Sequence, residues 1–185
     1  KSLGNYIGFT DAPEDMYGKV IKNGPYSEVA PQAQMKIGAL RERQKDYPEA
    51  VKAYEKAADV YHDQRPVAAD AQYKAAQAYT KQAKTAEYDQ NVSAQAIAAF
   101  NDFVILYPND PRVAEAQKSI ASLKTEQARG SYKIAKFYES KKLWKGARVY
   151  YNEVVNRDPD SKMGQEANRR IEELNKLAAD EPAPK

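Results

Sequence analysis

The sequence predicts an all-α protein built from repeated, antiparallel helix pairs, and three observations lead to that prediction. Alanine is the commonest residue and lysine, glutamine and glutamate are frequent, whereas only 8 of 185 residues are glycine. Such a composition favours helix. A pattern of small and aromatic residues recurs along the chain at fixed spacing. Most prolines fall between the helical stretches, where proline is tolerated.

The first recurring element marks one helix of each pair. The segment Ala33–Gly38 recurs as Ala71–Ala76, more loosely as Ala116–Ala121, and again as Ser131–Ala135. Small or apolar residues four and five positions apart in these segments share one face of a helix. A small residue near the end of the segment predicts close packing against the second helix of the pair.

The second recurring element marks the partner helix. It consists of an alanine, an aromatic residue four positions later, and an apolar or small residue three positions after that. The three copies are Ala50, Tyr54 and Ala57; Ala96, Phe100 and Phe103; and Ala147, Tyr151 and Val154. We expect this stripe to be buried and the aromatic residue to fill the gap toward the next repeat.

The two elements together have the spacing of a tetratricopeptide repeat (TPR), a helix–turn–helix unit of about 34 residues. In two copies, twelve residues separate the small residue of the first element from the alanine of the second. In the middle copy the interval from Ala76 to Ala96 is twenty residues. The eight additional residues predict a longer helix or a protruding loop near residues 81–90.

The expected architecture is a TPR superhelix with one long helix near 111–139. That segment holds two copies of the first element, no proline after Pro111, and one glycine, Gly130. We interpret residues 1–25 as an incomplete N-terminal repeat, 26–179 as a TPR array with a C-terminal capping helix, and 180–185 as a flexible tail. In chain order, the predicted helices span residues 13–23, 28–44, 47–62, 67–84, 92–107, 111–139, 142–157 and 161–178.

The composition excludes several kinds of chemistry. The chain has no cysteine and a single histidine, His62, so it has neither a thiolate nucleophile nor a multi-histidine metal site. No phosphate-binding loop or dinucleotide-binding glycine motif occurs. An enzyme would need a site made of carboxylates alone, and the carboxylates are interleaved with lysine as on solvated helix faces. We therefore expect no catalysis, no cofactor and no metal.

The charge pattern and the hydropathy restrict the partners. Lysine and arginine number 29 and aspartate and glutamate 26, with both signs mixed along the chain. Nucleic-acid binders concentrate their basic residues in one stripe, so we expect no nucleic-acid partner. No apolar run approaches the roughly 18 residues of a membrane span. No signal peptide is recognisable at the first residues of the sequence.

Two phrases are more specific than generic repeat sequence. They are Gly24–Gln34 (GPYSEVAPQAQ) and Phe103–Pro111 (FVILYPNDP). Together with the long helix that runs into Tyr132–Tyr138 (YKIAKFY), they resemble the BamD/YfiO family of outer-membrane lipoproteins over about residues 14–178. Members of that family typically carry P-x-S-x-x-A-x-x-A-Q and a loop insertion in a middle repeat.

The resemblance implies a periplasmic, lipid-anchored, non-enzymatic subunit of the machinery that assembles β-barrel proteins in the outer membrane. Its implied partners are unfolded outer-membrane proteins at the N-terminal repeats and a barrel-forming subunit with POTRA domains at the C-terminal repeats. The family's lipidated cysteine has no counterpart in this sequence, so membrane attachment is inferred from the resemblance alone. The alternative is a generic TPR adaptor, cytoplasmic or periplasmic, that binds another extended peptide or protein.

Two sets of residues are candidates for protein binding. TPR arrays bind extended peptides along their first helices, and counting along those helices selects as peptide-groove candidates Met35, Glu42, Arg43, Tyr73, Gln77 and Lys81. The basic turn after the long helix supplies the partner-docking candidates Lys141, Lys142, Leu143, Trp144, Lys145 and Arg148. Each set has a structural alternative: Met35 and Tyr73 pack on neighbouring helices, and Trp144 covers a corner between two helices.

Overall fold

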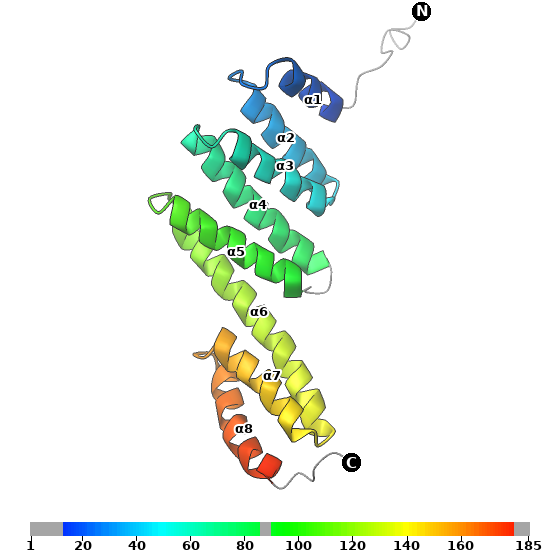
Figure 1. Ribbon diagram of the computed structural model, residues 1–185, viewed down its shortest axis with the longest axis vertical. Helices are drawn as coiled ribbons and strands as arrows, with labels where there is room; N and C mark the ends of the chain where they lie inside the picture. The colour runs from blue at the N-terminus through cyan, green and yellow to red at the C-terminus, as the bar shows by residue number, and fades with distance from the viewer. Residues whose placement is uncertain (1–12, 86–89, 180–185) are drawn as a thin grey trace, which may run out of the picture. The chain divides into compact units, whose positions relative to one another are not determined.

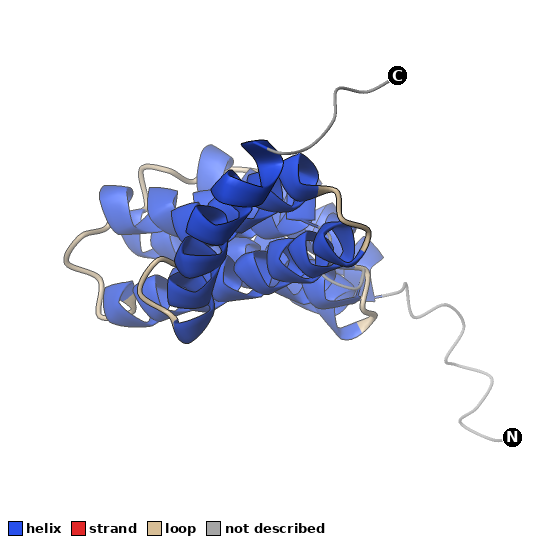
Figure 2. Cartoon of the chain, turned by 90° about the horizontal axis from the view of Figure 1, so that it is seen from below, coloured by secondary structure: helices blue, strands red, loops and turns tan. Residues whose placement is uncertain are grey.

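A computed structural model of the protein describes residues 13–85 and 90–179, and this part of the chain contains eight helices and no strand (Figure 1, Figure 2). They are α1 (Pro13–Asn23), α2 (Ala30–Arg43), α3 (Tyr47–Val60), α4 (Arg65–Thr85), α5 (Gln90–Leu106), α6 (Val113–Ser140), α7 (Trp144–Arg157) and α8 (Lys162–Ala179). The predicted all-α fold is confirmed, and every helix begins and ends within two residues of its predicted bounds. The predicted tail, and the first twelve residues of the predicted incomplete repeat, lie outside the described residues.

The chain divides into two compact units, one up to Gln117 and one from Lys118 onward. In unit 1, each helix from α1 to α4 packs against the next. In unit 2, α7 packs against both α6 and α8. Within each unit, Figure 1 shows consecutive helices lying side by side, with neighbours running antiparallel. The expected long helix is α6. Of the predicted insertion near residues 81–90, α4 holds the part up to Thr85 and α5 begins at Gln90, whereas residues 86–89 lie outside the described residues.

A glycine on α2 sets how closely α2 and α3 approach each other. A Cβ added to Gly38 would lie 2.5 Å from Cε1 of Tyr54, far inside van der Waals contact. The Tyr54 side chain is fully buried, and its ring occupies the space that the glycine leaves free. Phe100 and Tyr151, which hold the same position in the later repeats, are buried as well. The predicted aromatic core stripe is therefore confirmed.

The carboxylate of Glu42 accepts a hydrogen bond from the buried hydroxyl of Tyr54. This hydroxyl donates to Glu42 Oε2 at 2.9 Å, and Lys81 on α4 forms an ion pair with the same carboxylate. Burial alone would raise the pKa of Glu42, but the hydrogen bonds from Lys81 and Tyr54 and the nearby positive charges lower it below its ordinary value of 4.5. The three side chains form a tyrosine–carboxylate–cation triad that joins α2, α3 and α4.

Unit 2 contains an equivalent triad, with the same interval of 12 residues between glutamate and tyrosine and with arginine as the cation. The Tyr151 hydroxyl donates to Glu139 Oε2 at 2.6 Å, and Arg170 on α8 pairs with that carboxylate. In the intervening repeat, phenylalanine stands at position 100, and Thr80 takes the place of the glutamate and donates to the carbonyl oxygen of Ala76. The carboxylate is thus present where a core hydroxyl needs a partner, since an unpaired buried hydroxyl costs about 1–3 kcal/mol.

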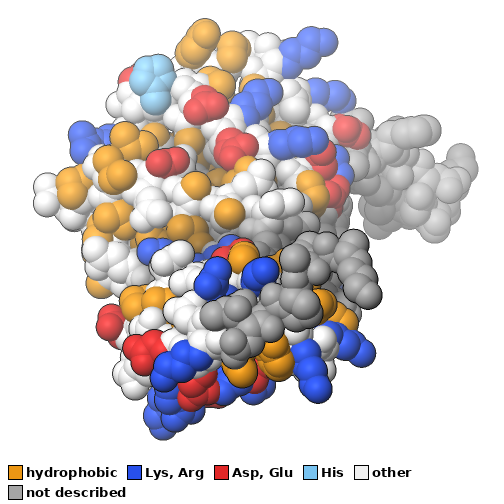
Figure 3. Space-filling view, turned by 60° about the horizontal axis from the view of Figure 1, so that its bottom comes forward, with side chains coloured by type: hydrophobic (Ala, Val, Ile, Leu, Met, Phe, Trp, Pro, Cys, Tyr) orange, Lys and Arg blue, Asp and Glu red, His pale blue; other side chains and the backbone are white. Residues whose placement is uncertain are grey.

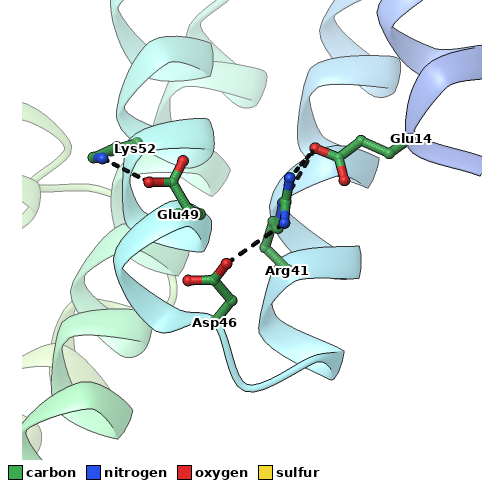
Figure 4. A network of polar contacts seen from close by, with 5 residues as sticks. All are labelled: Glu14, Arg41, Asp46, Glu49 and Lys52. Carbon is green, nitrogen blue, oxygen red and sulfur yellow. Dashed lines mark hydrogen bonds and ion pairs between the residues drawn. The ribbon is translucent and has the colours of Figure 1, made fainter.

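An arginine attaches α1 to the rest of unit 1 (Figure 4). Arg41 on α2 donates from Nη2 to Glu14 Oε1 at 2.7 Å and from Nε to the same oxygen at 3.1 Å. Its Nη1 lies 3.5 Å from Asp46 Oδ2 at the start of α3. Because these side chains are partly exposed, the ion pairs contribute little to stability and serve mainly to orient α1.

Gly38→Ala should destabilise the protein, although glycine-to-alanine changes inside helices ordinarily stabilise by about 0.5–1 kcal/mol. The added Cβ would overlap the Tyr54 ring, and overpacking costs about 1–3 kcal/mol. Gly18→Ala in α1 is a matched control that should stabilise, because no atom lies within 4 Å of the added Cβ. Urea unfolding of both variants measures the difference. Equal stability of the two variants would contradict the packing described above.

Lowering the pH below 4.5 should remove stability that depends on Glu42. Its pKa is lower in the folded protein than in the unfolded chain, so the stabilisation is present above the unfolded pKa and is lost as the pH falls through the folded pKa. Glu42→Gln should therefore lower the free energy of unfolding at pH 7. It should also reduce the loss of stability between neutral and acid pH, which is the acid limb of the pH profile. The control Glu28→Gln changes an exposed residue. An acid limb that is the same in all three proteins would refute the prediction.

Candidate protein-binding surfaces

A hollow of about 410 Å³ lies between the N-terminal halves of α2 and α4. Its lining residues are Gln32, Met35 and Lys36 from α2 and Pro66, Val67 and Asp70 from α4. Met35, Pro66 and Val67 supply its apolar surface, and Lys36 and Asp70 add one charge of each sign. We call this hollow the α2–α4 groove. It can hold an apolar side chain of an extended peptide while charged groups contact the peptide's polar atoms.

The groove exists because Met35 only partly fills the space between the two helices. Met35 is half-buried and packs against the core residues around Tyr54 and Ala71. In the next repeat the same position holds Tyr73, whose ring lies 5.1 Å from the ring of Phe103, centroid to centroid, and is 5% exposed. Tyr73 therefore packs in the core. The sequence allowed either this packing or contact with a peptide in the groove.

Arg112 covers the Tyr73 ring and connects α4 to the turn before α6. Its guanidinium carbon lies 4.8 Å from the ring centroid. Nε and Nη2 donate to the two carboxylate oxygens of Asp110 at 2.9 Å, and Nη1 donates to Asp70 Oδ1 at 2.8 Å. The hydrogen bonds from Arg112 lower the pKa of Asp110 below its ordinary value of 3.8. Asp70, at the groove, is thereby held in place by a residue 42 positions later in the chain.

The other predicted groove residues lie outside the lining of the hollow. Glu42 and Lys81 belong to the triad near the C-terminal ends of α2 and α4, whereas the groove lies between the N-terminal halves of these helices. Arg43, the last residue of α2, is exposed. Gln77 is half-buried and interacts with Tyr73. Of the six candidates, Met35 alone lines the hollow, and contact of the others with a peptide stays a prediction.

The sequence reasoning missed five lining residues because it counted from Met35 and Tyr73 toward the C-terminal ends of the helices. A signal was present in the other direction. Asp70 lies three residues before Tyr73, and Gln32 lies three residues before Met35, so each is one turn back along its helix. The five residues are Gln32, Lys36, Pro66, Val67 and Asp70.

The second candidate surface is the turn from α6 to α7, which we call the basic corner. It comprises Lys141, Lys142, Leu143, Trp144 and Lys145. Lys142 has a left-handed backbone with φ of 58°, as does Lys45 (62°) in the corresponding turn of unit 1. Leu143 is 46% exposed, so an apolar side chain stands among cations at this turn.

A phenylalanine that the sequence reasoning did not select adds to the basic corner. Phe137, on the last turn of α6, is 58% exposed, and Lys141 Nζ lies 5.8 Å from its ring centroid. Trp144, by contrast, is half-buried and packs against the core of unit 2, as the structural alternative expected. Arg148 points toward α8, where Nη1 donates to Asn175 Oδ1 at 2.8 Å. The exposed apolar groups of the corner are therefore Leu143 and Phe137.

Charges of both signs are mixed on the face of the molecule seen in Figure 3. Figure 3 shows positive and negative side chains interspersed over one face, with hydrophobic side chains between them. Within residues 13–85 and 90–179, no helix is long and apolar enough to cross a bilayer, and no group of three or more histidine, aspartate or glutamate side chains could hold a metal ion.

Comparison with models of known protein families identifies a match over most of the chain. The model of the YfiO family, described as outer membrane lipoprotein, matches residues 19–183. No curated protein matches the chain. The matched range includes both the α2–α4 groove and the basic corner.

Proposed function

The chain belongs to the YfiO family of outer membrane lipoproteins, and from that membership we propose that it is a non-enzymatic scaffold in the assembly of outer-membrane β-barrel proteins. In this role unit 1 binds unfolded segments of barrel proteins, and unit 2 binds a barrel-forming subunit through its POTRA domains. The protein acts in the periplasm, held at the outer membrane by a lipid anchor.

The observation that carries the substrate role is the α2–α4 groove. Strands of membrane barrels alternate apolar and polar residues over about ten positions. An extended segment of this kind can place one apolar side chain against Met35 and Val67. Lys36 and Asp70, with opposite charges, are in reach of its polar groups. Main-chain and polar contacts of this sort tolerate many sequences, which suits a protein that handles many barrels.

The basic corner supports the second role. Its lysines would steer an acidic surface of the partner toward unit 2, and Leu143 and Phe137 would supply apolar contact once the partner has docked. A generic TPR adaptor could use the same groove for another peptide. The family membership favours outer-membrane assembly over that alternative.

Val67→Glu should weaken binding of a barrel-strand peptide by about tenfold or more, because it places a charge against the apolar side chain in the groove. The probe is a labelled ten-residue peptide that alternates leucine or tyrosine with serine or threonine. The measurement is fluorescence anisotropy on variants with wild-type melting temperatures. Val149→Glu, at a 57% exposed position of unit 2, is the matched control and should bind normally. Equal affinity of the two variants would refute groove binding.

Lys142→Glu should slow association with the isolated POTRA domains of the barrel-forming subunit several-fold and should weaken the salt dependence of the rate. Lys45→Glu is a close control, because it makes the same change in the same left-handed backbone conformation in unit 1. Leu143→Ser should instead raise the dissociation rate, as loss of apolar contact predicts. Surface plasmon resonance measures both rates. Unchanged kinetics in Lys142→Glu and Leu143→Ser would exclude the corner as the docking surface.

A further inference from the structure

A second hollow of unit 1, of about 590 Å³, lies between the C-terminal ends of α3 and α5. The residues that decide its chemistry are Asp59, His62, Asp63, Arg65, Leu106 and Tyr107. None of these residues lines the α2–α4 groove. The hollow therefore has its own set of charged and apolar groups, and it is independent of the surfaces used in the proposed function.

The side chains of Arg65 and His62 at this hollow already contact other groups of the protein. Arg65 donates from Nη2 to the carbonyl oxygen of Leu106 at 3.1 Å, and its guanidinium carbon lies 5.7 Å from the ring centroid of Tyr107. His62 Nδ1 lies 2.9 Å from the carbonyl oxygen of Asp59. Among the described residues, the carboxylates of Asp59 and Asp63 have no ion-pair partner. Two aspartates against one arginine give the side chains that line the hollow a net negative charge.

These carboxylates lie where the electrostatics of a helix disfavours them. The C-terminal end of a helix carries partial negative charge and is stabilised by cations. Helices α1, α2, α4, α7 and α8 each have a basic residue in the last turn. Helices α3, α5 and α6 have none there. The last turn of α5 holds no carboxylate and Glu139 of α6 pairs with Arg170, whereas α3 carries the unpaired Asp59, with Asp63 one turn further along the chain. An unpaired carboxylate at the C-terminal end of a helix breaks a local rule, as residues at functional sites often do.

The apolar side of the hollow is exposed as well. Leu106 is 55% exposed, and its neighbour Ile105 on the last turn of α5 is 73% exposed. Exposed aliphatic side chains next to unpaired carboxylates match a ligand that is both basic and apolar. A lysine or arginine of such a ligand can extend its aliphatic stem over Leu106 while its charged head reaches Asp59 and Asp63.

We propose that this hollow is a docking site for a segment of another protein in which basic side chains alternate with aliphatic ones. The cation of the segment takes the place of the missing basic residue at the end of α3. Its aliphatic side chains cover Leu106 and Ile105. The site thus adds a third protein-binding surface to the chain, with a charge preference opposite to that of the basic corner.

The test uses a capped peptide of sequence Ser-Leu-Arg-Leu-Arg-Leu-Ser and the 15N-labelled full chain. Amide shifts in the NMR spectrum should concentrate at Asp59–Asp63 and at Leu106–Tyr107. The double change Asp59→Asn with Asp63→Asn should weaken binding about tenfold, and binding should also weaken as salt is added. A peptide with glutamate in place of each arginine should not bind.

A second readout separates docking from a structural role. Because the two aspartates oppose the dipole of α3, the double variant should melt about 1–4 °C higher than wild type. A structural role would lower the melting temperature. Asp160→Asn, which changes an exposed carboxylate of unit 2, is the matched control and should leave peptide binding unchanged. Binding of the barrel-strand peptide to the α2–α4 groove should be the same in the double variant and in wild type, so this proposal and the proposed function fail separately.

Three outcomes would overturn the proposal. The first is peptide affinity that does not depend on Asp59 and Asp63. The second is amide shifts confined to the α2–α4 groove or to unit 2. The third is self-association of the protein, measured by sedimentation, that the double variant abolishes, because the occupant would then be a second copy of this chain.

Discussion

The contact between Gly38 and the Tyr54 ring determines how closely α2 and α3 pack in unit 1. Because the glycine has no side chain, α3 approaches α2 closely enough for the tyrosine hydroxyl to reach Glu42. The same carboxylate pairs with Lys81, so the triad also links α4 to α2. The α2–α4 groove lies between those two helices.

The repeats show how one packing scheme accommodates different side chains. Where the core residue is tyrosine, a glutamate twelve positions earlier accepts its hydrogen bond and a cation from a later helix balances the charge. Where it is Phe100, the position of the glutamate holds Thr80, which bonds to its own helix. The polar residues follow from the need to satisfy buried groups. Tyrosine and glutamate occur together in two repeats of this chain, and both are replaced in the third. The explanation therefore needs no comparison with other proteins.

The candidate binding surfaces lie where that packing is incomplete. Met35 lines a hollow, whereas Tyr73 at the same position of the next repeat is buried and lies under Arg112. The basic corner exposes Leu143 and Phe137 among lysines, and the end of α3 carries acidic residues where a cation would be favoured. The three surfaces also differ in charge, which would allow the protein to hold different partners by different chemistry.

The sequence by itself determined the helices, their pairing, the buried aromatic stripe, the long helix α6 and the family. These features depend on spacing along the chain, because a helix face repeats every three or four residues and prolines interrupt it. Only the tertiary structure decided which side of each helix stays open. Met35 and Tyr73 occupy equivalent positions, yet the one lines a groove and the other is core, because Arg112 arrives from a distant turn to cover the tyrosine. Trp144 was equally ambiguous until its neighbours in unit 2 were known. Exposure depends on the volumes and charges of residues far apart in sequence, and periodicity does not contain that information.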